Sequence, residues 1–114
     1  MEAIDTARRA LEAASDKQAA DIVLLDIRQA CSFADYFVIC SGDSERQIEA
    51  IRQAIADTLE KEGRTPHHCE GTAGSGWVVL DFGDVIVHVF STFEREYYQL
   101  DSLWSKAQLI VKMQ

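Results

Sequence analysis

Residues 77–90 have the sequence WVVLDFGDVIVHVF, and they carry the clearest structural signal in the chain. Gly83 and Asp84 separate two runs of β-branched and aromatic residues, which is the signal of a β-hairpin with a two-residue loop. Such a loop pairs Phe82 with Val85, and from there successive side chains along both strands alternate between the two faces of the hairpin. One face of the predicted hairpin carries six apolar residues and is expected to be core: Val78, Leu80, Phe82, Val85, Val87 and Val89.

The opposite face of the hairpin has a mixed composition. It combines two large aromatic side chains with a carboxylate, an imidazole and aliphatic residues: Trp77, Val79, Asp81, Ile86, His88 and Phe90. One interpretation is that a helix covers this face and that Trp77 is ordinary core. The other is that Trp77 and its neighbours form a docking patch, because aromatic anchors with a polar rim are typical of binding hot spots. The pattern alone favours the covered face.

The residues before the hairpin predict two helices and two strands. Apolar residues at helical spacing predict a helix over residues 2–15, and β-branched runs predict strands at 21–27 and 36–40. Neither strand alternates cleanly, which indicates that protein covers both of its faces. Ser44 and Gln47 have the spacing of a capping box, so we expect a second helix to begin there.

The remaining elements complete an α/β pattern. Gly63 is expected to end the second helix, and residues 65–69 form a short extended piece before a glycine-rich loop at 70–76. Residues 93–104 have helical spacing, and we expect three of them to bury against the sheet: Phe93, Leu100 and Trp104. The order of elements predicts a single α/β domain, with a mixed β-sheet of about five strands flanked by helices.

The composition favours a folded domain with a basic partner. The chain has 114 residues, of which 47% are hydrophobic and 26% charged, and no stretch is apolar enough to span a membrane. Its net charge of −8 opposes binding to a phosphate backbone and favours encounter with a basic surface. The first residues lack the apolar core of a secretory signal, and the odd number of cysteines, 3, suits reduced thiols. We therefore expect a cytoplasmic protein.

The residue types of common catalytic sites are present, but not in catalytic spacings. Residues 67–69 are adjacent histidines and a cysteine without a metal-ligand pair such as CxxC, so no metal or cofactor is expected. The glycines of residues 70–76 form no phosphate-binding fingerprint. Residues 36–48, a strand followed by Ser-Gly and a helix, are similar to the start of a nucleotidyltransferase. That chemistry needs two acids converging on Mg²⁺, whereas Asp81 and Asp84 belong to a strand and its turn.

Three stretches in this order resemble one known family: ADYFVICSGDSERQI at 34–48, WVVLDFGDVIVHVF at 77–90 and REYYQLDSLW at 95–104, together with Glu70-Gly71. On these residues the chain resembles the ribosomal silencing factor family, also called Iojap-like. The resemblance covers roughly residues 4–106, and the W-V-x-L-D-F-G-D-V-x-V-H-V-F run is its most specific part. We accordingly assign residues 1–106 to a ribosomal silencing factor domain and residues 107–114 to a C-terminal tail.

The resemblance implies both a fold and a function. The fold would be a nucleotidyltransferase-like α/β domain that has lost its catalytic acids, and the protein would not be an enzyme. Members bind the large ribosomal subunit through one basic ribosomal protein, the fourteenth of the large-subunit series, at the subunit interface. There they sterically block joining of the small subunit and so repress translation when nutrients are limiting. The resemblance implies no cofactor, no direct contact with nucleic acid and no membrane.

The resemblance also implies a partner-binding surface. Matched by position, the family's residues fall on seven residues of this chain: Trp77, Asp81, His88, Arg95, Tyr98, Leu100 and Asp101. The chain departs from the family just before the last helix, where Thr92 and Phe93 replace the Pro-Glu of many relatives. A contact made by that Glu is not carried over here, although Glu94 is the adjacent residue.

Two functions of other classes remain open on the sequence. A nucleotidyltransferase-like, nucleotide-binding enzyme would be indicated by Mg²⁺-dependent turnover or by binding of a nucleotide. A homodimeric scaffold would use the surface around Trp77 for self-association, and its mass would depend on concentration.

Overall fold

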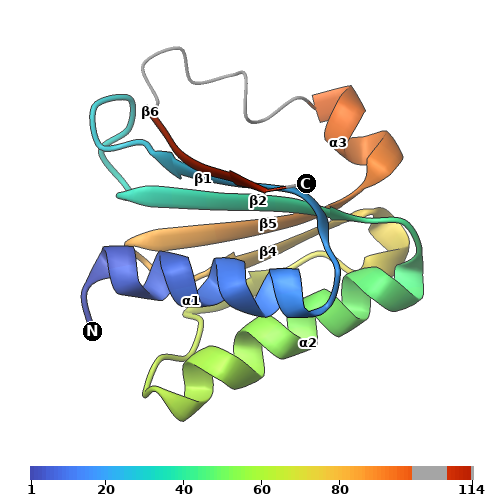
Figure 1. Cartoon of the computed structure of the whole chain (residues 1–114), viewed down its shortest axis with the longest axis horizontal. Helices are drawn as coiled ribbons and strands as arrows, with labels where there is room; N and C mark the ends of the chain where they lie inside the picture. The colour runs from blue at the N-terminus through green and yellow to red at the C-terminus, as the bar shows by residue number, and fades with distance from the viewer. Residues whose placement is uncertain (99–107, 114) are drawn as a thin grey trace.

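The computed structural model describes residues 1–98 and 108–113, apart from the side chains of Tyr97 and Tyr98. Figure 1 shows a central sheet with α1 and α2 on one side, and with α3 at the end of β5 and directed away from those two helices. In chain order the elements are α1 (Ala3–Asp16), β1 (Ala20–Asp26), β2 (Tyr36–Gly42), α2 (Glu45–Lys61), β3 (His68–Glu70), the 3₁₀ turn η1 (Ala73–Ser75), β4 (Trp77–Asp81), β5 (Val85–Ser91), α3 (Thr92–Tyr98) and β6 (Gln108–Met113).

The sheet is mixed and has the strand order β3-β4-β5-β2-β1-β6. Among the described strands only β2 and β5 run parallel, whereas the other neighbours are antiparallel. The chain between β2 and β5 passes through α2, β3, η1 and β4. The predicted class, a single α/β domain with a mixed sheet flanked by helices, is confirmed. The sheet has six strands instead of about five, because β6 adds to the edge at β1.

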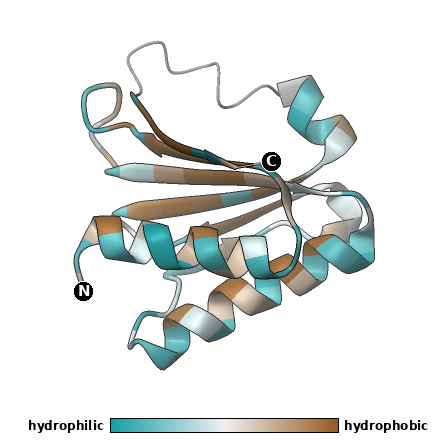
Figure 2. Ribbon diagram, in the orientation of Figure 1, coloured by the Kyte–Doolittle hydropathy of each residue, from teal (hydrophilic) through white to brown (hydrophobic). Residues whose placement is uncertain are grey.

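Two apolar clusters lie on the two faces of the sheet. The larger one packs beneath α1 and α2 and includes the six residues of the hairpin face that was predicted to be core, each at most 1% exposed. The smaller one lies on the opposite face around Phe37, Ile39 and Phe90. Figure 2 shows the strands predominantly apolar, whereas α1 and α2 carry both hydrophobic and hydrophilic residues. All residues of β2 are buried, which confirms the prediction that both of its faces are covered.

The hairpin forms in the predicted register. Trp77 lies opposite Phe90, Val79 opposite His88, and the Phe82 N–H donates to the Val85 carbonyl at 2.9 Å. Because the two-residue loop fixes which residues face each other, it also fixes the membership of both faces.

The caps of α2 confirm its predicted limits with one difference. The Ser44 hydroxyl accepts from the Gln47 N–H, but the Gln47 side chain accepts from Asp43 at 2.7 Å and not from the cap residue itself. At the other end Gly63 has φ +85° and its N–H donates to the Glu60 carbonyl. This is the left-handed position after a helix that glycine occupies without strain.

The prediction that Phe93 buries against the sheet is wrong, since its side chain is 71% exposed. The helix α3 starts directly at the end of β5, and its first turn therefore lies beyond the strands (Figure 1). The other two residues of that prediction, Leu100 and Trp104, lie outside the described residues.

Candidate functional site

The mixed face of the hairpin, called here the Trp77 face, is built around the rings of Trp77, His88 and Phe90, which contact one another. The Trp77 indole N–H donates to Nδ1 of His88 at 3.2 Å, and the indole stacks on Phe90 with ring centroids 4.9 Å apart. The His88 ring meets Phe37 of β2 edge-on at 4.7 Å. The Trp77 side chain is only partly buried, whereas Phe90 is fully buried. Trp77 therefore packs against the smaller apolar cluster and also reaches the surface. It is part of the core, as the first interpretation of this face has it, and it is accessible to a partner, as the second requires.

His88 is held as a neutral imidazole. Its side chain is 6% exposed, and burial lowers its pKa to about 4 because the charged form loses solvation. Since Nδ1 accepts from Trp77, the proton of the neutral ring is assigned to Nε2. This Nε2 is buried and has no hydrogen-bond partner within the described part of the chain. The histidine thus fixes the orientation of Trp77.

Asp81 shapes the hairpin turn. Its carboxylate accepts from the Gly83 N–H at 2.8 Å, which is a local turn-forming bond. Asp84 instead accepts from the Arg64 guanidinium at 2.9 Å. The two acids thus have separate structural partners. Among the described residues no group of three or more His, Cys, Asp or Glu could hold a metal ion.

Arg95 connects α3 to the end of β2. Its guanidinium donates to the Ser41 hydroxyl at 3.0 Å, and Cys40, the preceding residue of β2, is fully buried in the larger apolar cluster. Burial raises the pKa of the Cys40 thiol to about 12, so this cysteine is protonated at neutral pH. Tyr98 belongs to α3, but its side chain lies outside the described residues, as do Leu100 and Asp101. Of the seven predicted site residues, the structure brings Trp77 and His88 together. It places Asp81 at the end of β4, bonded to the hairpin turn, and Arg95 beside β2.

The loop that joins β3 to β4 is a specific turn. Thr72 and Ser75 form a reciprocal capping box around η1. Gly71 and Gly76 both have positive φ, and a Cβ at Gly71 would lie 2.0 Å from the Trp77 carbonyl oxygen. These glycines therefore allow a close backbone approach, and the loop is positioned against the start of β4.

The structure also contains a cavity that sequence reasoning missed. It has a volume of about 350 Å³ and borders the Trp77 face, with six lining residues: Glu70, Gly71, Ser75, Trp77, Val79 and Glu94. The Glu70-Gly71 pair was a sequence signal for this place, but its meaning depends on β3, β4 and α3 coming together. The cavity adds two carboxylates to the aromatic Trp77 face.

The start of α2 does not favour a phosphate ligand. A Cβ at Gly42 would lie 2.9 Å from Cγ1 of Ile48, so this glycine allows the helix to pack closely on the strand. A second cavity of about 340 Å³ in front of it is lined by the acids Asp43, Glu45 and Glu94. Among the described residues no group of three or more acids could hold a metal ion, and without a metal these carboxylates repel a nucleotide phosphate. This arrangement counts against the nucleotidyltransferase-like alternative.

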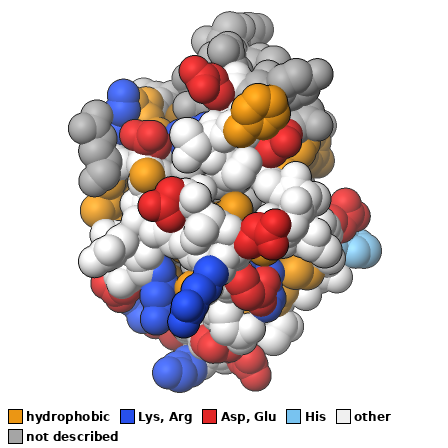
Figure 3. Space-filling model, turned by 90° about the vertical axis from the view of Figure 1, so that its right-hand side faces the viewer, with side chains coloured by type: hydrophobic (Ala, Val, Ile, Leu, Met, Phe, Trp, Pro, Cys, Tyr) orange, Lys and Arg blue, Asp and Glu red, His pale blue; other side chains and the backbone are white. Residues whose placement is uncertain are grey.

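Figure 3 shows the end of the molecule that contains α3 and the start of α2. Acidic side chains spread over its upper and middle parts with apolar side chains between them, and most of the Lys and Arg side chains in view lie lower. This distribution favours a cationic partner at the acidic part of the surface.

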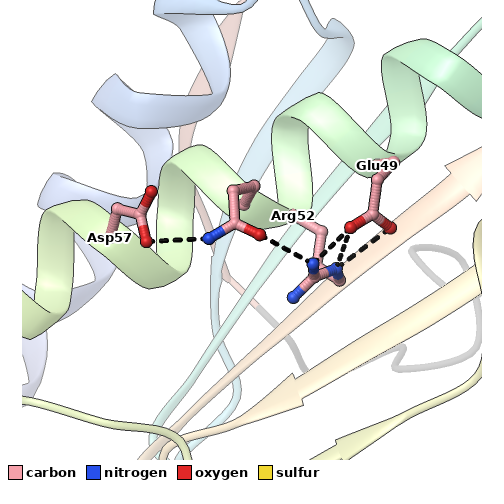
Figure 4. Close-up of polar contacts among 4 residues, drawn as sticks. Glu49, Arg52 and Asp57 are labelled. Carbon is pink, nitrogen blue, oxygen red and sulfur yellow. Dashed lines mark hydrogen bonds and ion pairs between the residues drawn. The ribbon is translucent and has the colours of Figure 1, made fainter.

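The outer surface of α2 is different in character. Arg52 donates to Glu49 and to Gln53, and Gln53 in turn donates to Asp57 at 2.8 Å (Figure 4). Because these polar groups bond to one another along the helix, they offer a partner little uncompensated charge. No helix within residues 1–98 and 108–113 is long and apolar enough to cross a membrane.

Taken together, these features define a small mixed α/β domain with an aromatic and acidic surface suited to docking. Comparison with known families identifies it more closely. The sequence model of the family described as ribosomal silencing factor during starvation matches residues 1–114, and the chain belongs to this family. The resemblance inferred from the sequence is therefore confirmed.

Individual relatives agree with this assignment. The chain is 44% identical over 100 residues to the ribosomal silencing factor RsfS of Bacillus subtilis, which covers 88% of this chain and 85% of that protein. It is 34% identical over 96 residues to the chloroplastic protein Iojap of Zea mays, covering 84% of this chain and 42% of the plant protein. A crystal structure of a protein from Chromobacterium violaceum superposes with a TM-score of 0.88 at 33% identity, covering 97% and 94% of the two chains.

Proposed function

We propose that this protein silences ribosomes by binding the large subunit at the subunit interface and sterically blocking association with the small subunit. It would thereby repress translation when nutrients are limiting, in the cytoplasm, and without catalysing a reaction. Membership of the ribosomal silencing factor family over the whole chain is the observation that carries the proposal. The partner would be one basic ribosomal protein, the fourteenth of the large-subunit series.

The Trp77 face is the proposed docking surface. Trp77 is partly exposed yet held by His88 and Phe90, so little side-chain freedom is lost when a partner packs on it. Large, oriented aromatic side chains of this kind dominate the energetics of many interfaces. The net charge of −8 adds attraction toward a basic protein.

Sedimentation of purified subunits through sucrose gradients tests this function. With the protein present at Mg²⁺ concentrations that allow joining, it is expected to travel with large subunits and to shrink the peak of joined ribosomes. A Gln53→Ala variant, altered on the outer surface of α2, is expected to behave like the wild type. Protein that stays at the top of the gradient with an unchanged ribosome peak would refute the proposal.

Self-association is a second candidate, favoured by one observation. β6 is an edge strand whose Leu109 is 55% exposed and Ile110 38% exposed, and an apolar edge of this kind can pair with another chain. Sedimentation equilibrium over a wide range of protein concentrations is expected to show a concentration-dependent mass. An Ile110→Lys variant should then remain monomeric, and a monomeric wild type at all concentrations would exclude this candidate.

A further inference from the structure

We propose that the cavity between Glu70, Trp77 and Glu94 receives one arginine side chain of the partner protein. This inference rests on the proposed function, because it specifies the chemistry by which the Trp77 face recognises a basic protein.

The cavity is shaped by backbone that only glycine permits. Gly76 has φ +80°, and a Cβ there would lie 2.6 Å from Cγ of Glu94 and 2.9 Å from the Ser91 hydroxyl. The missing side chain therefore lets Glu94 lie across the loop, where it lines the cavity. The Ser91 hydroxyl in turn accepts from the Glu94 N–H at 3.1 Å, which fixes the start of α3. Loop and helix are thus held to each other at this cavity.

The two carboxylates that line the cavity have no counterion among the described residues. Neither Glu70 nor Glu94 forms an ion pair with any Lys, Arg or His in the part of the chain that is described. Elsewhere such acids are paired, for example Glu49 with Arg52 and Asp84 with Arg64. Two carboxylates that no described cation neutralises favour a cation in the cavity and disfavour a phosphate or carboxylate ligand.

The Trp77 indole in the cavity wall favours a guanidinium over an ammonium group as the bound cation. Phe90 stacks against the indole, and the partly exposed remainder of the side chain lines the cavity together with Val79. A guanidinium can stack on an aromatic ring while its N–H groups donate to carboxylates, whereas an ammonium is compact and strongly hydrated. The volume of about 350 Å³ lies at the lower limit of ligand cavities, which fits a single side chain better than a cofactor.

The inference can be tested without the ribosome. The probe is N-acetyl-arginine amide, titrated into ¹⁵N-labelled protein while NMR spectra are recorded, with N-acetyl-citrulline amide as the uncharged control of the same shape. We expect saturable shifts at the Trp77 indole N–H and at the amides of Gly71 and Ser75, with roughly tenfold weaker binding of citrulline. Glu70→Gln and Glu94→Gln should each weaken binding of the arginine probe about fivefold. Glu49→Gln removes the same charge from α2 and should leave it unchanged.

The same variants separate this inference from the proposed function. If wild-type protein binds large subunits, Glu70→Gln and Glu94→Gln should weaken that binding about fivefold and reduce its dependence on salt, unlike Glu49→Gln. Unchanged binding by both variants, or arginine shifts that do not saturate or lie elsewhere, would overturn the arginine site and leave the silencing function intact. Saturable arginine binding by a protein that does not bind large subunits would support the site and refute the silencing function.

Discussion

Lowering the pH from 7 to 5 is expected to destabilise this protein through His88. The folded state holds the imidazole neutral, with its pKa lowered to about 4 by burial, whereas the unfolded chain has the ordinary pKa of 6.5. As the pH falls through 6.5, the unfolded state binds a proton that the folded state does not bind. The stability associated with His88 is therefore fully present above pH 6.5 and is lost progressively as the pH approaches 4.

The magnitude follows from the two pKa values. Their separation corresponds to about 3 kcal/mol in total, of which about 2 kcal/mol disappears between pH 7 and pH 5. The carboxyl groups with altered pKa values contribute little in this range. Hydrogen bonds from Arg28 and Arg52 lower the pKa of Asp26 and Glu49, respectively, so both carboxyl groups titrate at more acidic pH.

Urea unfolding followed by circular dichroism at several pH values measures this effect. A His88→Gln variant is the matched control, because its amide oxygen can still accept from the Trp77 indole N–H but cannot titrate. The wild type should lose about 2 kcal/mol more than the variant between pH 7 and pH 5. Equal pH dependence of the two proteins would refute the assignment of a buried neutral imidazole.

Three further substitutions give separate tests. Trp77→Ala should reduce stability and weaken binding to large subunits by about 2 kcal/mol each, because Trp77 stacks on Phe90 and also reaches the surface. Urea unfolding measures the first loss and a subunit-binding assay the second. If neither loss is found, Trp77 is neither a core residue nor an interface residue. Arg64→Ala should cost about 1–2 kcal/mol of stability, because the variant loses hydrogen bonds to Thr6, the Phe82 carbonyl and Asp84. Its binding to large subunits should be unchanged. Weakened binding by the folded variant would contradict a purely structural role for Arg64. Gly76→Ala should cost about 2 kcal/mol of stability in thermal unfolding, because the added Cβ would meet Glu94 and Ser91. Gly63→Ala is the control and should cost about 1 kcal/mol, since nothing lies within 4 Å of its added Cβ. Equal costs would show that the contact with Glu94 is unimportant.

The hairpin could be predicted in full because its determinants are local. A two-residue loop at Gly83-Asp84 fixes the register, and the register assigns every side chain to a face. The limits of α2 were predictable for the same reason, since Ser44 and Gly63 act on their nearest backbone neighbours.

The elements that depend on distant segments could not be predicted in the same way. The sequence of β6 is a short apolar run whose type is ambiguous until its partner β1 is known. Helical periodicity placed Phe93 on the same face as Leu100, but periodicity does not tell where a helix begins relative to the sheet. The 71% exposure of Phe93 follows from that position.

In the candidate site, too, the features fixed by local sequence could be predicted, and those that depend on distant segments could not. Trp77 and His88 were predicted to share a face, and the structure adds the hydrogen bond between them. The cavity could not be predicted, because Glu70, Trp77 and Glu94 come from three elements that only the fold brings together. The structural role of Arg95 depends likewise on the proximity of α3 to the end of β2.

Site-specific photo-crosslinking to large ribosomal subunits tests whether the protein docks through the Trp77 face. A photoreactive amino acid is placed at Val79, beside Trp77 in the cavity, and in a second protein at Gln53 on the outer surface of α2. The account predicts a crosslink from position 79 to one basic large-subunit protein and none from position 53. A crosslink from position 53 alone, or none from either position, would contradict docking through the Trp77 face.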